Sequence, residues 1–363
     1  MTRLTAEARA RAATPEALLA QFCDHMAGHG LAIGGTPEAR HIAFPGGAAT
    51  LRLEPGGLAL RIEAENADRL ADAKATVAGH LDAFAPGEAL GIVWQGDGAA
   101  AADSRPHNFR AVRLRAARDI TPRMRRLTFA GPDLGRFEAE MLHVKLLIPE
   151  DGAGSSPQGE PRWPVLSPSG QAVFEGCALT RRTYTIRRID AASGELDIDF
   201  VLHGDASPGS RFAARARPGD WLGITGPGGG TIPLQEWSLL AGDETALPAI
   251  ARALEAAPPT ARGLALIEVA DAAEIQALRA PPGFALRWLP RDGAAHGAPL
   301  LQAVCATPWP EQGAVSAWAA CEARTARALR ERWGADPRLP RGQFRAAAYW
   351  REGLAEGAAQ AEH

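Results

Sequence analysis

The chain of 363 residues has few cysteines and no long apolar segment. Its four cysteines, Cys23, Cys177, Cys305 and Cys321, include no Cys-x-x-Cys pair, which disfavours a disulfide scaffold and a zinc or iron–sulfur site. No stretch of about 18 residues stays apolar, which excludes a membrane-spanning helix. The N-terminus also lacks the apolar core of a secretory signal, so we expect a cytoplasmic protein with reduced, mostly buried thiols.

The chain also lacks a strong charge of one sign and has almost no lysine. Its formal net charge of −3 argues against a general nucleic-acid binder. Lys74 and Lys145 are the only lysines among the 39 lysine and arginine residues. The Gly-x-Gly-x-x-Gly string of the standard dinucleotide-binding turn is missing as well. The 46% hydrophobic share nevertheless supports ordered cores, and the length predicts about two or three domains.

Residues 1–97 predict a small α+β domain, followed by a linker over 95–106 that is rich in small and polar residues and ends in proline. A Glu-Pro-Gly-Gly turn between two alternating segments predicts a hairpin. The expected elements are, in chain order, a helix from Thr14–Pro15 to about Gly28, strands at 41–44, 48–53 and 58–64, a helix from Asn66 to about Phe84, and a short strand with Ile92 and Trp94.

The rest of the chain predicts two further domains. Residues 107–232 contain six short β-like runs with little helix between them, which favours a small antiparallel barrel, and residues 151–176 form a long surface loop within it. In residues 235–355, β-like runs alternate with helical ones, which predicts a parallel sheet with helices on its faces. The fold class is therefore a multidomain α+β chain: a small α+β domain, an antiparallel β-barrel and an α/β domain.

The string Arg-Thr-Tyr-Thr-Ile-Arg at 182–187 lies on one of the predicted barrel strands. It resembles the R-x-Y-T-x-R signature of the siderophore-interacting proteins, a branch of the ferredoxin-reductase-like flavoproteins. The resemblance implies that Arg182, Tyr184 and Thr185 bind FAD. An arginine can fork onto a pyrophosphate, a tyrosine offers an aromatic plane, and a threonine can reach the flavin N5 edge. The alternative is an ordinary exposed strand with surface arginines.

Two more strings resemble the same family and imply further cofactor-binding residues. Residues 200–227 resemble its next block, in which His203, Ser207 and Ser210 lie beside a helix start that favours a phosphate. Phenylalanine and serine replace the usual tryptophan and glycine there. Gly-Asp-Glu-Thr-Ala-Leu-Pro-Ala-Ile at 242–250 resembles the family's strand-to-helix turn near the flavin and the nicotinamide. It implies cofactor contacts for Asp243, Thr245 and Ala246, although Asp243 and Thr245 can also simply cap the helix.

The C-terminal strings complete the resemblance, which covers roughly 107–355. Residues 318–323 resemble W-x-A-G-E-A, with Cys321 where glycine is common, and residues 349–353 resemble Y-W-R-x-G. The resemblance implies that Lys145 and Arg351 lie beside the acceptor pocket. Together with Thr185 at the flavin, they are the expected catalytic residues. Ferric siderophores with catecholate groups are anionic, so a cationic pocket suits them. A solvated strand residue and a sheet-end salt bridge are the alternatives for Lys145 and Arg351.

The resemblance implies an FAD-dependent oxidoreductase that passes electrons from NAD(P)H through flavin to a ferric siderophore and releases Fe(II). The barrel is then the flavin domain and the α/β domain the nicotinamide domain. A flavin reductase with another acceptor or a ferredoxin partner, and a siderophore carrier without catalysis, are the alternatives. NADH and NADPH are not distinguished, although Arg291 or Arg324 could meet a 2′-phosphate.

The N-terminal domain resembles an uncharacterised domain often fused ahead of this family. Its His25 and His29, four residues apart on a predicted helix, share a face. No acidic partner beyond Asp24 completes a ligand set, so we expect no metal site, and surface or core histidines are the preferred interpretation. The domain could instead be an interaction module.

Overall fold

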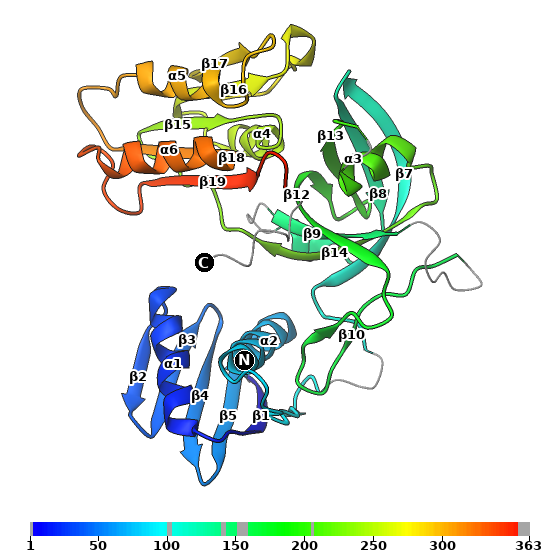
Figure 1. Ribbon diagram of the computed structural model, residues 1–363, viewed down its shortest axis with the longest axis vertical. Coiled ribbons are helices and arrows are strands. Elements are labelled where there is room, and N and C mark those ends of the chain that lie inside the picture. Colours follow the sequence, from blue (N-terminus) through cyan, green and yellow to red (C-terminus); the bar gives the residue numbers. More distant parts are fainter. Residues whose placement is uncertain (1–2, 100–103, 139–142, 151–158, 205–206, 355–363) are drawn as a thin grey trace. The chain divides into compact units, whose positions relative to one another are not determined.

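The computed structural model describes residues 3–99, 104–138, 143–150, 159–204 and 207–354 (Figure 1). The chain forms two compact units. The first comprises residues 1–109 together with 152–178, and the second comprises 110–151 together with 179–363. Within the described residues, none of the helices is both long and apolar enough to cross a membrane.

The first unit is built on a six-stranded antiparallel sheet with the strand order β2-β3-β4-β5-β1-β6. Apolar side chains alternate along β1 and β5 with charged ones, so one face packs on the two helices and the other is polar. The elements are β1 (Leu4–Arg11), α1 (Pro15–Gly28), β2 (Ile33–Thr36), β3 (Ala39–Phe44), β4 (Gly47–Glu54), β5 (Gly57–Ala64), α2 (Ala67–Phe84) and β6 (Gln95–Gly96).

Two predictions about this unit were wrong. The last strand was expected to contain Ile92 and Trp94, but it is β6 at Gln95–Gly96. Ile92 and Trp94 are buried but belong to no strand. The expected linker therefore begins inside the sheet, where β6 pairs with β1 and the backbone N–H of Thr5 donates to Asp97. Strand β1 itself was not expected, because its inward residues are alanines, which signal a strand weakly.

The segment between two of the barrel strands, which we call the excursion (residues 152–178), belongs to the first unit and is not a simple surface loop. Its residues 159–178 carry the short hairpin β10 (Val165–Leu166) and β11 (Ala172–Val173). The Trp94 indole N–H donates to the Ser169 carbonyl over 2.8 Å, and the Gln171 amide donates to the Ala75 carbonyl over 2.6 Å. These bonds satisfy buried polar groups with partners about 75 to 96 residues away. The first residues of the expected loop, 151–158, lie outside the described part.

In the second unit, the six predicted strands close into an antiparallel barrel with the order β12-β13-β8-β7-β14-β9 (Figure 1). Its core is a cluster of aliphatic and phenylalanine side chains drawn from alternate strand positions. The elements are β7 (Phe109–Thr121), β8 (Met124–Ala130), η1 (Gly135–Glu138), β9 (His143–Pro149), β12 (Leu179–Asp190), β13 (Glu195–Val201), α3 (Pro208–Arg215) and β14 (Trp221–Gly228).

The remaining elements form the predicted parallel sheet, with the order β17-β16-β15-β18-β19. The chain moves outward from β15 on one side and then returns to β18 on the other, so the order reverses between these strands. Ligands bind at the carboxyl ends of such a pair. The elements are β15 (Trp237–Gly242), α4 (Leu247–Ala256), β16 (Arg262–Val269), η2 (Ala272–Glu274), β17 (Gly283–Pro290), α5 (Ala298–Ala306), β18 (Val315–Glu322), α6 (Ala323–Gly334) and β19 (Phe344–Trp350).

Candidate functional site

The barrel meets the carboxyl edge of the parallel sheet where β9 and β12 pair. Thr185 of β12 lies directly opposite His143 of β9, and Thr183 lies opposite Lys145. The His143 Nε2 and the Tyr349 hydroxyl at the end of β19 are hydrogen-bonded over 3.0 Å, with their rings edge to face. The sequence analysis missed this pair, although His143 stands two residues before the lysine that it did single out.

The environment keeps His143 neutral near pH 7. Burial, followed by the positive charges of Arg345, Lys145 and Arg252, lowers the pKa of His143 to about 4. Burial raises the pKa of its partner Tyr349 well above its ordinary value. An uncharged hydrogen bond therefore joins the barrel to the sheet next to Thr185, which is itself 5% exposed.

The residues predicted to bind flavin on β12 differ in their burial and in their contacts. Arg182 is half-buried, and its guanidinium donates to the backbone carbonyl of Arg181. The Tyr184 ring packs against Phe200 of β13 with 4.6 Å between centroids, so it belongs partly to the barrel core. A Cβ placed on Gly209 of α3 would overlap the Tyr184 hydroxyl, which is why helix and ring can pack this closely.

Helix α3 presents its N-terminal turn beside this tyrosine. Ser207 is its N-cap residue but makes no side-chain cap bond, and the first turn carries no acidic residue. Ser210 is buried, and its hydroxyl accepts the backbone N–H of His203 over 3.0 Å. The His203 side chain is exposed. The free backbone N–H groups of such a turn favour an anion, so Ser207 remains better placed than Ser210 to offer a hydroxyl to a ligand.

The turn after β15 is a closely packed structural element. One Asp243 oxygen accepts both the backbone N–H and the hydroxyl of Thr245, and the other accepts the Trp350 indole N–H over 2.8 Å. Burial raises the pKa of Asp243 despite these bonds. Ala246 is fully buried and tight against Gly242. Of the three predicted cofactor contacts here, Thr245 is the most exposed, and the Asp243 carboxylate is occupied by protein donors.

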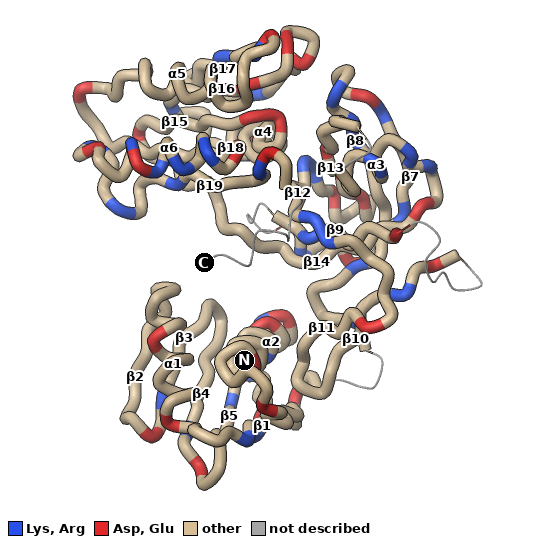
Figure 2. Tube along the Cα trace, in the orientation of Figure 1, with Lys and Arg blue, Asp and Glu red and all other residues tan. Residues whose placement is uncertain are grey.

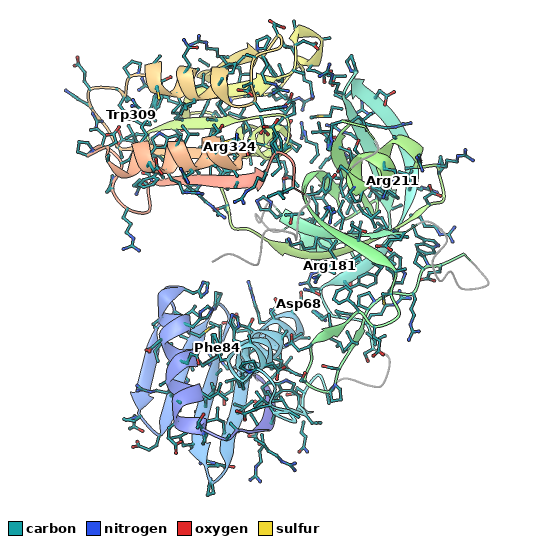
Figure 3. The ribbon with its side chains drawn as sticks, in the orientation of Figure 1. Asp68, Phe84, Arg181, Arg211, Trp309 and Arg324 are labelled. Carbon is teal, nitrogen blue, oxygen red and sulfur yellow. The ribbon has the colours of Figure 1, made fainter. Side chains whose placement is uncertain are left out.

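Strand β18 lies next to β15 and ends at the same carboxyl edge of the sheet. Cys321 is 1% exposed, and burial raises the pKa of its thiol. Glu322 caps α6 by accepting the backbone N–H of Arg324 over 2.6 Å. The side chain of Arg324 lies exposed on the first turn of α6 (Figure 3). Of Arg291 and Arg324, the two arginines considered for a 2′-phosphate, Arg324 is therefore the accessible one.

The other of those two arginines is held by protein carboxylates. Arg291 donates twice to Glu244, over 2.6 and 3.0 Å, and once to Glu268 over 3.2 Å. Glu268 is fully buried and also accepts the backbone N–H groups of Gly297 and Leu300 at the start of α5. The Arg291 side chain is 8% exposed, so the structure does not support the suggested 2′-phosphate contact of Arg291.

Lys145 and Arg351 lie at corresponding places on the two elements that meet through His143 and Tyr349. Lys145 lies two residues after His143 on β9, and Arg351 lies two residues after Tyr349, just past the end of β19. The Lys145 ammonium contacts the Thr183 hydroxyl, and the Arg351 side chain is exposed. Figure 2 shows the lysine and arginine positions along these strands. Both side chains therefore stay outside the cores, as a cationic rim requires.

The predicted helical histidine pair in the first unit is a close contact. The Nε2 atoms of His25 and His29 lie 3.1 Å apart, and the His80 ring lies 4.9 Å from that of His25. In the residues that the structure describes, no three His, Cys, Asp or Glu side chains are arranged to hold a metal ion.

Comparisons with known families divide the chain in the same order as its elements. Residues 113–231 match the siderophore-interacting FAD-binding domain, and residues 235–353 match the siderophore-interacting protein family. Residues 7–95 match a family described as an uncharacterized protein conserved in bacteria.

Curated relatives and solved structures agree with these matches. The ferric vibriobactin reductase of Vibrio cholerae is 33% identical over 66% of this chain and 88% of the relative. The NADPH-dependent ferric-chelate reductase of Escherichia coli is 30% identical over 67% of this chain and 92% of the relative. A siderophore utilization protein from T. fusca superposes with a TM-score of 0.59 and 39% identity, over 69% of this chain and 96% of that one. The chain belongs to the siderophore-interacting protein family, and it carries a further N-terminal domain ahead of the family's two domains.

Proposed function

We propose that this protein is an NAD(P)H-dependent ferric-siderophore reductase with FAD as its cofactor. The observation that carries the proposal is the junction where the neutral His143–Tyr349 bond joins strands β9 and β12 to the carboxyl edge of the sheet. Hydride donor and acceptor must be held in line and away from water, and a neutral contact that joins the two domains suits this requirement. The names of the relatives, two of which are reductases of ferric chelates, support the same reaction.

The residues around α3 fit FAD. The first turn of α3 carries no carboxylate, the Ser207 hydroxyl is not used as a cap, and Gly209 leaves room for the Tyr184 hydroxyl. We assign the diphosphate of FAD to this turn and to Arg182, and the ring system to Tyr184 and Thr185. A bound flavin supplies the conversion between a two-electron donor and a one-electron acceptor.

The chain's own residues bind and orient the two substrates. The carboxyl edge beside Thr245 and Arg324 takes NAD(P)H, because ligands bind where the strand order of a parallel sheet reverses. Lys145 and Arg351 attract the anionic ferric siderophore to the rim beside Thr185. No side chain need act as a general acid or base, since Fe(III) reduction loosens the iron from hard oxygen ligands without proton transfer.

Spectroscopy of the purified protein tests the proposal. We expect a yellow protein whose flavin absorbance bleaches with NADH or NADPH without oxygen and returns when a ferric catecholate siderophore is added. Failure to bleach with either nucleotide contradicts the proposal. Return of colour with ferricyanide but with no ferric siderophore indicates a flavin reductase with another acceptor.

Charge-removing variants test the siderophore end. Lys145→Gln and Arg351→Gln should each raise KM for an anionic ferric siderophore about tenfold, as expected for a lost charged contact, and leave the bleaching rate unchanged. Arg341→Gln, which removes an exposed arginine before β19, is the matched control. Equal KM values in all three variants contradict the assignment.

We also propose a cytoplasmic location. All four cysteines are free thiols, as a reducing compartment maintains them. Cell fractionation followed by immunoblotting tests this proposal.

A further inference from the structure

A row of charged side chains crosses four neighbouring strands of the barrel, β7, β8, β13 and β12. Arg118 of β7 lies directly opposite Arg126 of β8, and Arg126 lies directly opposite Asp199 of β13. Arg187 stands on β12 where its register with β13 shifts. Like charges directly opposite each other in an antiparallel pair are destabilising, so the Arg118–Arg126 pair needs compensation.

The protein compensates two of these three guanidinium groups. Arg126 is bonded to both oxygens of Asp199, over 2.6 and 2.7 Å, and Arg187 is bonded to both oxygens of Glu255 of α4, over 2.6 and 2.8 Å. Arg118 is exposed, and among the described residues no carboxylate forms an ion pair with it. The row therefore keeps one uncompensated positive charge, on Arg118, next to two paired arginines.

The three arginines line a cavity of about 320 Å³ in the second unit. Its other walls are Ile120 and residues 275–278, which follow the carboxyl end of β16 through η2. Because one water occupies about 30 Å³ of liquid, this space is large enough for a phosphate group with some of its hydration. A ligand that extends along the carboxyl edge of the sheet would reach it.

We propose that this cavity is a binding site for a phosphate group, with Arg118 as its recognition residue. A phosphate would meet a fork of donors from the uncompensated Arg118. Arg126 and Arg187 would lie beside it, held in position by the carboxylates that balance their charge. The phosphate could belong to a nicotinamide dinucleotide or be free inorganic phosphate. Only the first of these ligands rests on the proposed function. Neither Arg291, which is clamped, nor the N-terminal turn of α3 is part of this cavity.

Isothermal titration of the FAD-loaded full chain tests this proposal in a phosphate-free buffer. The probes are NADP⁺, NAD⁺ and inorganic phosphate, and the variants are Arg118→Gln and Arg118→Lys. We expect Arg118→Gln to weaken binding of at least one probe about tenfold or more, as for a charged hydrogen bond, and Arg118→Lys to restore part of that loss. Arg115→Gln, which removes an exposed arginine of the same strand outside the cavity, should bind all three probes like the unchanged protein.

The pattern of losses identifies the source of the phosphate. A loss for NADP⁺ alone assigns the 2′-phosphate, a loss for both nucleotides assigns their diphosphate, and a loss for inorganic phosphate alone assigns a free anion. Equal affinities of Arg118→Gln and Arg115→Gln for all three probes overturn the proposal. A chain that binds phosphate through Arg118 but is not bleached by NADH or NADPH would refute the proposed function and leave this site standing.

Discussion

At the scale of single residues, the site depends on keeping one histidine uncharged. His143 lies among Arg345, Lys145 and Arg252, so a proton on its ring would be opposed by burial and by three positive charges. Its hydrogen bond to Tyr349 joins the barrel to the sheet. The same cationic surroundings that suit an anionic substrate therefore also hold the junction neutral.

This histidine should make stability depend on pH in a defined window. Its pKa is about 4 when folded and about 6.5 when unfolded, so below pH 6.5 the unfolded chain binds a proton that the folded chain refuses. The stabilisation is complete above about pH 6.5 and is lost as the pH falls toward 4. We expect urea unfolding of the second unit to show a loss on the order of 2 kcal/mol between pH 7 and pH 5.

The matched variants are His143→Gln and His41→Gln. His143→Gln should lose this part of the pH dependence, because glutamine does not titrate. His41→Gln, which alters a histidine on the sheet of the first unit, should retain it. Identical slopes in both variants would show that other groups cause the loss.

At the scale of elements, helix α3 depends on the absence of one side chain. Gly209 has an ordinary helical backbone, and what it provides is space for the Tyr184 hydroxyl. The contact sets how closely the helix approaches the strand that carries Arg182.

Gly209→Ala should therefore push Tyr184 or the helix aside. We expect a loss of about 1–3 kcal/mol in stability, as for other overpacked sites, and weaker FAD retention during gel filtration. Adding Tyr184→Phe removes the overlapping oxygen and should restore part of both. Gly135→Ala is the control, because its added Cβ meets no atom within 4 Å. Equal losses from the two glycine variants would contradict this explanation.

Helix α5 depends on a buried carboxylate at its start. Glu268 accepts the backbone N–H groups of the N-cap residue Gly297 and of Leu300 in α5, and one guanidinium N–H of Arg291. A charge in this position holds β16, β17 and α5 together, since Arg291 follows β17 directly.

Glu268→Gln should destabilise the α/β domain by about 2–4 kcal/mol, because its amide cannot replace the charge that the buried Arg291 and the helix N-terminus need. Chemical denaturation measures the change. Glu311→Gln, an exposed position before β18, should change stability by less than about 0.5 kcal/mol. A small effect of Glu268→Gln would mean that Glu244 alone suffices for Arg291.

At the scale of the whole molecule, the chain's two compact units are not successive in sequence. Residues 159–178 leave the barrel between β9 and β12 and form their bonds with Trp94 and Ala75 of the first unit. Removing residues 1–97 alone would therefore leave this excursion without those partners.

Two truncated variants should differ accordingly. Without residues 1–97, we expect trypsin to cut within 159–178 faster than in the full chain, because buried polar groups there lose their partners. A variant that also replaces residues 152–178 with a short Gly-Ser linker should resist trypsin and keep its flavin spectrum. Slow cleavage of the first variant would show that the excursion is ordered on its own.

Much of the architecture could be predicted from sequence because it is local. The two helices of the first unit, the six barrel strands, and the five strands and helices α4 and α6 of the α/β domain follow from caps, turns and apolar periodicity. The central strand β1 could not be predicted, because its alanines fit a helix as well as a strand. Helix α5 was also missed, although Gly297 and Pro299 mark its start.

The motif strings of this sequence determined by themselves its family and the part of the chain where a flavin site should be sought. Only the tertiary structure decided what the side chains at that site do. In the folded chain, Asp243 accepts a hydrogen bond from Trp350, and Arg291 donates to two carboxylates. His143 bonds to Tyr349, which lies 206 positions away in the sequence. The physical reason is that a motif reports local spacing, whereas a partner's identity depends on which distant strands the fold brings into register.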